Sequence, residues 1–205
     1  MKQIILIGRP NSGKTLFAIH FAEYLGVHNI RIVFRAHNGI VTSRRFTPEE
    51  AKRELCGPDL HKTKHLQSVT LNMPIGRTNI DFLLNDTCGI AEEIHPDKTI
   101  RRGMAQTLNL MRQADYIFHM IDASQPAACH ADGKSNKNTN IDSEIYYYGI
   151  VRSAYSILVN KIDIVDDSQC LKQVQSRYPQ AAIIPVSALH GTGFREVKAC
   201  VGHNI

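Results

Sequence analysis

The chain has 205 residues, of which 43% are hydrophobic and 21% are charged, and this composition is typical of one globular domain that buries its own core. No apolar run is long enough to cross a bilayer, and the short apolar run at residues 4–7 does not resemble a signal peptide. We therefore expect a cytoplasmic protein without a membrane span. The formal net charge of +5 permits an acidic partner such as RNA.

Hydrophobic periodicity predicts strands and helices that alternate along the chain. We expect strands at residues 3–7, 65–72, 79–85, 116–121, 156–159 and 181–186. We expect helices at residues 16–25, 48–56, 97–113, 142–152, 168–178 and 193–201. Residues 30–35 could form a short strand or an extended strip. Small and polar residues dominate 126–141, which indicates a mobile loop and not a linker between domains.

This order of elements predicts an α/β fold with three layers. A mostly parallel six-stranded sheet is expected to lie between two layers of helices, with one antiparallel strand from the hairpin at 65–85. Ligands of such sheets bind beyond the carboxyl ends of the strands. Motifs that follow predicted strands are therefore the candidates for function.

The first such motif is Gly8-Arg9-Pro10-Asn11-Ser12-Gly13-Lys14-Thr15, between the strand at 3–7 and the helix that follows. Backbone N–H groups of such a loop point inward and, with the helix N-terminus, form an anion site that suits phosphate. Lys14 would reach the outer phosphates, and the Thr15 hydroxyl would bind a Mg²⁺ that bridges them.

Three further motifs follow later strands. Asp86-Thr87-Cys88-Gly89 brings a carboxylate for Mg²⁺ and a glycine N–H for a γ-phosphate. Asn160-Lys161-Ile162-Asp163 brings a carboxylate that can accept both N–H donors of a guanine edge, and adenine lacks that pair of donors. Ser187-Ala188-Leu189 offers a backbone N–H for the guanine oxygen. Four such motifs in this order predict a guanine nucleotide site.

These motifs resemble those of P-loop GTPases of the translation-factor-related class, and the first resembles the Era-like branch. The resemblance covers nearly the whole chain and implies one GTP-binding G domain over residues 1–205 that hydrolyses GTP, with an insertion at about 28–58. Cys88 stands where the family usually has proline. The nucleotide-binding residues implied are Asn11, Ser12, Gly13, Lys14, Thr15, Leu16, Asn160, Lys161, Asp163, Ser187, Ala188 and Leu189. The Mg²⁺ ligands implied are Thr15, Thr63 and Asp86, and the catalytic residues are Lys14, Asn11, Thr63 and Gly89.

Two of these roles depend on family position. The switch threonine that binds Mg²⁺ is assigned to Thr63, because Thr70 and Thr78 fall within or beside predicted strands, although Thr63 could also be a solvated loop residue. Ile90 occupies the position at which other GTPases carry a glutamine that orients water, so slow hydrolysis is expected. In some relatives an asparagine at the position of Asn11 helps bind K⁺. Asn11 either does so here or only stabilises the loop.

Basic residues gather in the insertion and the first switch, where they form either a solvated face or a surface for rRNA, the ribosome or an acidic protein effector. They are Arg31, Arg35, Arg44, Arg45, Lys52, Arg53, Lys62 and Lys64. A K⁺ site completed in a nucleotide-dependent dimer is also compatible with the resemblance. Two alternatives to a slow GTPase switch remain open, which are a GTP-binding regulatory module with negligible turnover and a metallochaperone-like P-loop protein.

Overall fold

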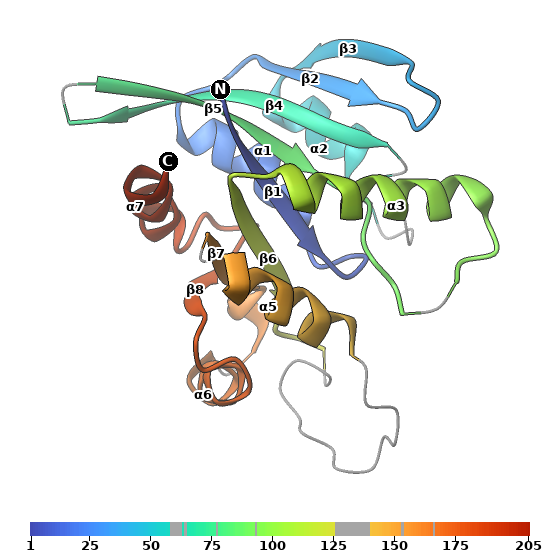
Figure 1. Ribbon diagram of the computed structural model, residues 1–205. Coiled ribbons are helices and arrows are strands. Elements are labelled where there is room, and N and C mark those ends of the chain that lie inside the picture. Colours follow the sequence, from blue (N-terminus) through green and yellow to red (C-terminus); the bar gives the residue numbers. More distant parts are fainter. Residues whose placement is uncertain are drawn as a thin grey trace.

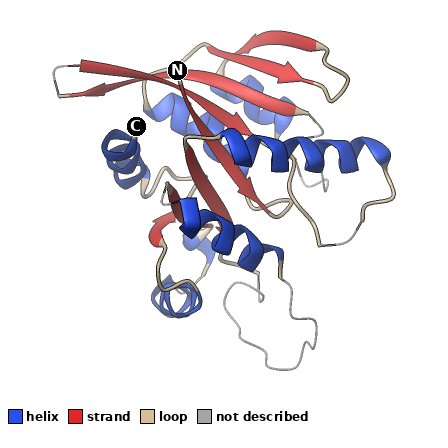
Figure 2. Cartoon of the chain, viewed as in Figure 1, coloured by secondary structure: helices blue, strands red, loops and turns tan. Residues whose placement is uncertain are grey.

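The computed structural model describes residues 1–57, 63, 65–76, 78–92, 94–125, 140–152, 154–165 and 167–205. One sheet runs through the molecule in the strand order β3-β2-β4-β5-β1-β6-β7-β8, with helices on both faces (Figures 1 and 2). The three-layer α/β fold expected from the sequence is confirmed. The expected loop at 126–141 lies outside the described residues except for its last two positions.

The parallel part of the sheet carries the strands that lead into the motifs. It comprises β1 (Lys2–Gly8), β5 (Thr78–Asp86), β6 (Tyr116–Asp122), β7 (Tyr155–Asn160) and β8 (Ala182–Val186). All five strands point the same way, so Gly8, Asp86, Asp122, Asn160 and Val186 end at one edge of the sheet.

The other part of the sheet is antiparallel, and it corrects the expected strand count. β4 (Leu66–Ile75) pairs antiparallel with both β5 and β2 (Ile30–Arg35), and β2 pairs antiparallel with the edge strand β3 (Val41–Phe46). The sheet therefore has eight strands instead of six, and β3 and β4 run against the others. Five of the six β3 residues are exposed, so this strand lacks the alternation that would reveal it in the sequence.

Alternate residues of β1 divide the core into two layers. Ile4 and Leu6 pack with α1 (Lys14–Tyr24), α2 (Pro48–Leu55) and α7 (Phe194–Asn204). Ile5 and Ile7 pack on the other face with α3 (Lys98–Gln113), α5 (Ile141–Arg152) and α6 (Asp167–Arg177). Figure 1 shows α3 and α5 in front of the sheet and α1 and α2 behind it. A strand buried on both faces is nearly continuous in apolar residues, as the run at 4–7 is.

The helix expected at 48–56 occupies Pro48–Leu55 and begins with a capping box. The Thr47 hydroxyl accepts the Glu50 N–H at 3.3 Å, and the Glu50 carboxylate accepts the Thr47 N–H at 2.9 Å. These two bonds satisfy donors that an isolated helix end leaves unpaired. Within the described residues, no helix is both long and apolar enough to span a membrane.

Candidate nucleotide-binding site

The phosphate loop joins β1 to α1, and it contacts the ends of two neighbouring strands. Gly13 has φ +96°, and a Cβ there would lie 2.2 Å from the side-chain nitrogen of Asn160. Only glycine allows both this left-handed backbone and the close approach of the motif after β7. Asn11 also adopts a positive φ, 59°, and its side chain lines the nucleotide cavity.

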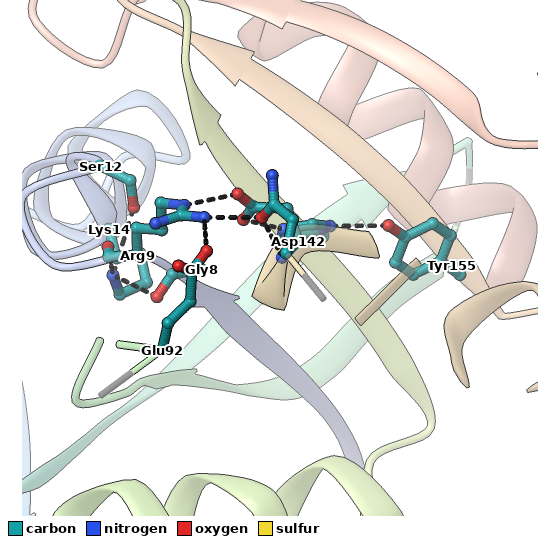
Figure 3. A network of polar contacts seen from close by, with 9 residues as sticks. Gly8, Arg9, Ser12, Lys14, Glu92, Asp142 and Tyr155 are labelled. Atoms are coloured by element: carbon teal, nitrogen blue, oxygen red, sulfur yellow. Dashed lines mark hydrogen bonds and ion pairs between the residues drawn. The ribbon is translucent and has the colours of Figure 1, made fainter. Parts of the chain in front are cut away.

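Lys14 is buried, and Figure 3 shows its contacts with the phosphate loop. Its Nζ donates to Arg9 O at 2.6 Å, Gly8 O at 3.3 Å and Ser12 Oγ at 3.2 Å. Burial lowers the pKa of Lys14 to about 8, although the negative charge of Asp86 opposes this shift. A buried ammonium that is held mainly by neutral groups gains from an anionic ligand, and phosphate would provide that charge.

Three oxygen ligands suited to Mg²⁺ meet beside Lys14. The Thr15 hydroxyl donates to Asp86 Oδ2 at 2.7 Å, and Thr15 Oγ1 lies 2.9 Å from Thr63 Oγ1. Because Thr15 has one hydroxyl proton, which goes to Asp86, Thr63 donates to Thr15. The structure thus brings together the three residues that the sequence assigned to the metal.

Asp86 provides the test of whether a cation fits there. Its second oxygen, Oδ1, is buried and has no hydrogen-bond partner among the described residues. Burial raises the pKa of this carboxyl to about 6, even though Thr15 and Lys14 act to lower it. A buried carboxylate oxygen without a partner is costly, and a hard divalent cation such as Mg²⁺ would satisfy it. The residues present therefore fit this metal.

Asn160 connects the three loops that would surround a guanine nucleotide. Its amide nitrogen donates to Ser12 O at 2.8 Å, and its amide oxygen accepts the Ala188 N–H at 2.9 Å. Ser187 is buried and accepts the His190 N–H at 3.2 Å, while Leu189 is exposed. One side chain thus fixes the phosphate loop against the loop after β8.

The rest of the base motif turns away from the sheet. Lys161 has a left-handed backbone, and the short 3-10 helix Ile162–Ile164 presents an exposed Asp163. Lys161 Nζ donates to Asp122 Oδ2 at 2.6 Å. The sequence analysis did not single out Asp122, although the end position of a buried strand in an α/β sheet is a signal that could have found it. The Asp163 carboxylate makes no hydrogen bond within the described part of the chain, so it is available to a ligand.

A cavity of about 370 Å³ lies beside the phosphate loop. It is lined on the loop side by Pro10, Asn11, Gly13, Lys14, Thr15 and Leu16, and by Thr63, Thr87, Gly89 and Lys161. The end of α2 closes another side with Leu55, Cys56 and Gly57. The insertion therefore contributes to the site itself, which the sequence did not indicate.

A family model described as "CobW/HypB/UreG, nucleotide-binding domain" matches residues 55–184, which include the Asp86 and Asn160 motifs but not the phosphate loop. The chain belongs to this family of P-loop GTPases. GTPase Der of Rickettsia africae (strain ESF-5) is 24% identical over 211 residues, which cover 97% of this chain and 38% of the relative. The tRNA modification GTPase MnmE of Bordetella petrii is 26% identical over 149 residues, 71% of this chain and 28% of the relative. The chain thus spans about a third of the length of these relatives.

Solved structures show the same fold. Era in complex with MgGDPNP and a 16S ribosomal RNA fragment has a TM-score of 0.67 at 20% identity, over 99% of this chain and 56% of that one. A probable GTP-binding protein engB has a TM-score of 0.60 at 13% identity, over 99% of this chain and 98% of that one. The resemblance to P-loop GTPases is confirmed by the family model, and Era shares the fold.

Proposed function

We propose that the chain binds GTP with Mg²⁺, hydrolyses it slowly to GDP and phosphate, and acts as a nucleotide-dependent switch within one G domain over residues 1–205. The observation that carries this proposal is the bonding of Asn160 to both Ser12 O and the Ala188 N–H. These bonds hold a phosphate loop and a base loop on the two sides of one residue. The candidate metal ligands, Thr15, Thr63 and Asp86, lie together at the other end of the site.

Each residue then has one task. The loop amides and Lys14 would hold the phosphates, the Gly89 N–H would contact the γ-phosphate, and Asp163 would accept the two guanine donors. Thr15, Thr63 and Asp86 would hold Mg²⁺, which when bound neutralises charge on the β- and γ-phosphates. Ser187, Ala188 and Leu189 would supply backbone contacts to the base.

Slow turnover follows from Ile90, which is 3% exposed and whose aliphatic side chain cannot orient water. The Ile90 N–H is already bonded to Gly8 O at 3.0 Å. A monovalent cation beside the phosphates would supply positive charge that the site lacks, and Asn11, which lines the cavity, would help hold K⁺. A dimer that forms with nucleotide would complete such a site.

The test is to measure nucleotide affinity and single-turnover phosphate release in Na⁺ and in K⁺, at low and high protein concentration. We expect binding of GTP and GDP but not ATP, and slow release that K⁺ accelerates. Asp163→Asn should shift preference from guanine to xanthine nucleotides, because an amide cannot accept both guanine donors. Equal affinity for ATP and GTP would contradict the base assignment. Binding without release in either salt would favour the regulatory module with negligible turnover.

The metallochaperone-like alternative has no supporting cluster of ligands. Within the described ranges, no group of three or more His, Cys, Asp or Glu side chains could hold a metal ion. The match to the family model described as "CobW/HypB/UreG, nucleotide-binding domain" does not separate that function from the GTPase switch.

Exposed arginines on β2 and β3 would suit an anionic partner such as the RNA backbone. Arg31 and Arg45 lie directly opposite each other on β2 and β3, and Arg35 follows about 13 Å along the strand on the same face. None of the three forms a salt bridge with another described residue. Such like-charge pairs are unfavourable without an anion, and repeated guanidinium groups match successive phosphates.

A pocket of about 500 Å³ lies against α3 and is lined by His37, Asn38, Arg102 and Gln106, among others. Gln106 Nε2 donates to Arg35 O at 3.4 Å, which connects this pocket to β2. Arg102 Nη1 donates to His37 Nε2 at 2.9 Å, so His37 Nδ1 carries a proton, and that buried atom has no partner among the described residues. Because α3 follows the Asp86 motif, a partner bound here would sense the nucleotide. RNA binding that falls steeply with salt and is lost in Arg31→Gln/Arg45→Gln supports an rRNA partner, whereas salt-independent binding contradicts it.

A further inference from the structure

Arg9, the second residue of the phosphate loop, connects three separate segments (Figure 3). Its Nε donates to Asp142 Oδ2 at 2.6 Å. Its Nη2 donates to Asn140 Oδ1 at 2.6 Å and to Glu92 Oε1 at 2.5 Å. Asn140 and Asp142 lie at the start of α5, and Glu92 follows the Asp86 motif by three residues.

Buried groups hold the α5 side of this network in place. Asp142 Oδ1 lies 3.1 Å from His119 Nε2, and His119 Nδ1 lies 2.7 Å from the Tyr155 hydroxyl. Nε2 of His119 donates to the Asp142 carboxylate. In the neutral imidazole the other nitrogen, Nδ1, then carries no proton and accepts the Tyr155 hydroxyl proton. Burial alone would raise the pKa of Asp142, but the bond with His119 and the pairing with Arg9 outweigh it and hold that pKa at about 2. The guanidinium is therefore anchored on a permanent carboxylate.

The other side of the network borders the nucleotide cavity without entering it. Gly89 and Pro10 line the cavity, whereas Arg9 and Glu92 do not. Gly89 is packed so closely that a Cβ on it would lie 2.5 Å from Pro10 N. The Ile90 N–H donates to Gly8 O at 3.0 Å. Residues 89 and 90 thus lie against the phosphate loop, and the Arg9–Glu92 pair attaches the far end of the same segment, residues 89–92, to that loop.

We propose that Arg9 is a positioning residue: through Glu92 it holds residues 89–92 against the phosphate loop and so favours guanosine triphosphate over the diphosphate. This inference rests on the proposed GTP binding. In the proposed complex Gly89 would contact a γ-phosphate, which GDP lacks, so fixing Gly89 in advance would raise the affinity for the triphosphate alone. Asn160 lies on the base side and would serve both nucleotides equally, so this segment contributes to the preference.

The test compares Glu92→Gln with Glu144→Gln. Glu144 is an exposed carboxylate on α5 that makes no ion pair within the described part of the chain, so it controls for the lost charge. Affinities for GDP and for the non-hydrolysable analogue GDPNP are measured with Mg²⁺. We expect Glu92→Gln to weaken GDPNP about 3- to 10-fold and to leave GDP unchanged, because the pair is half-exposed and contributes modestly. Glu144→Gln should match the wild type for both nucleotides.

Hydrogen exchange of the Ile90 amide in the nucleotide-free protein tests the pair without any ligand. Exchange should be faster in Glu92→Gln and unchanged in Glu144→Gln, because the Ile90–Gly8 bond opens more often when Glu92 is released. Unchanged exchange, an unchanged GDPNP-to-GDP ratio, or equal weakening of both nucleotides would each overturn the role of Arg9. A wild-type protein that binds neither nucleotide would refute the proposed function, and the exchange result would still decide whether Arg9 holds the segment.

Discussion

The two ends of the candidate nucleotide site, a base end at the Asn160 motif and a metal end at Asp86, differ in how their polar groups are satisfied. At the base end, the Asn160 amide donates to Ser12 O and accepts the Ala188 N–H, and Lys161 pairs with Asp122. At the metal end, Asp86 Oδ1 is buried without a partner among the described residues. The base end is therefore built as part of the fold, whereas the metal end keeps binding capacity for a ligand at some cost in stability.

The largest expected effect is on nucleotide affinity, and it is expected at Lys14, which lies between the two ends. Lys14→Ala removes a buried ammonium that we propose binds the phosphates, and GTP and GDP affinity should fall about 100-fold or more. Stability without nucleotide should fall less than affinity does: Gly8 O, Arg9 O and Ser12 Oγ lose the Nζ donor, but burial of an ammonium is itself costly and offsets part of that loss. Titration with a fluorescent nucleotide measures the first effect and thermal unfolding the second. Near-normal GTP binding by this variant would count against the phosphate loop.

Asn160→Ala should damage the base end even when no ligand is present. It leaves Ser12 O and the Ala188 N–H buried without their partner, which costs about 2 kcal/mol or more in the free energy of unfolding. Denaturant unfolding of the nucleotide-free protein measures this loss. Asn79→Ala, at an exposed position on β5, is the matched control and should change stability by less than about 0.5 kcal/mol. Equal stability of the two variants would contradict the view that the base end is part of the fold.

The Arg9 network predicts a pH dependence on the acid side. The folded-state pKa of Asp142 is about 2, below the ordinary aspartate value, so its contribution is complete above about pH 4 and is lost as the pH falls toward 2. About 2 kcal/mol of unfolding free energy should disappear over that window. Asp142→Asn should flatten this part of the profile, whereas Asp81→Asn, an exposed position on β5, should keep it. An unchanged slope in Asp142→Asn would show that the carboxylate is not held as described.

The smallest effect on stability is expected at the metal end. Asp86→Asn removes a buried charge that has one unpartnered oxygen, so the nucleotide-free protein should unfold within about 0.5 kcal/mol of the wild type or become slightly more stable. Mg²⁺ should no longer strengthen GTP binding in this variant. Scanning calorimetry of the nucleotide-free protein measures the stability, and titration calorimetry with and without Mg²⁺ measures the GTP affinity. A large loss of stability in Asp86→Asn would remove the difference between the two ends.

The sequence by itself determined the loops that form the candidate nucleotide site. Gly8 to Thr15 shape a local loop, and the motifs at Asp86, Asn160 and Ser187 each follow a buried strand, so their meeting at one sheet edge follows from parallel strand order. Thr63 was chosen on family order, and the structure places it 2.9 Å from Thr15. Its role toward Mg²⁺ remains a prediction.

Only the tertiary structure decided the features that depend on distant or exposed residues. β3 is a strand because it pairs with β2, not because its exposed residues alternate. The end of α2 reaches the cavity because the insertion packs on α1, which no local pattern encodes. Arg9, His119 and Asp142 are far apart in the chain, and only the packing of β6 and α5 beside the phosphate loop brings their polar groups into contact.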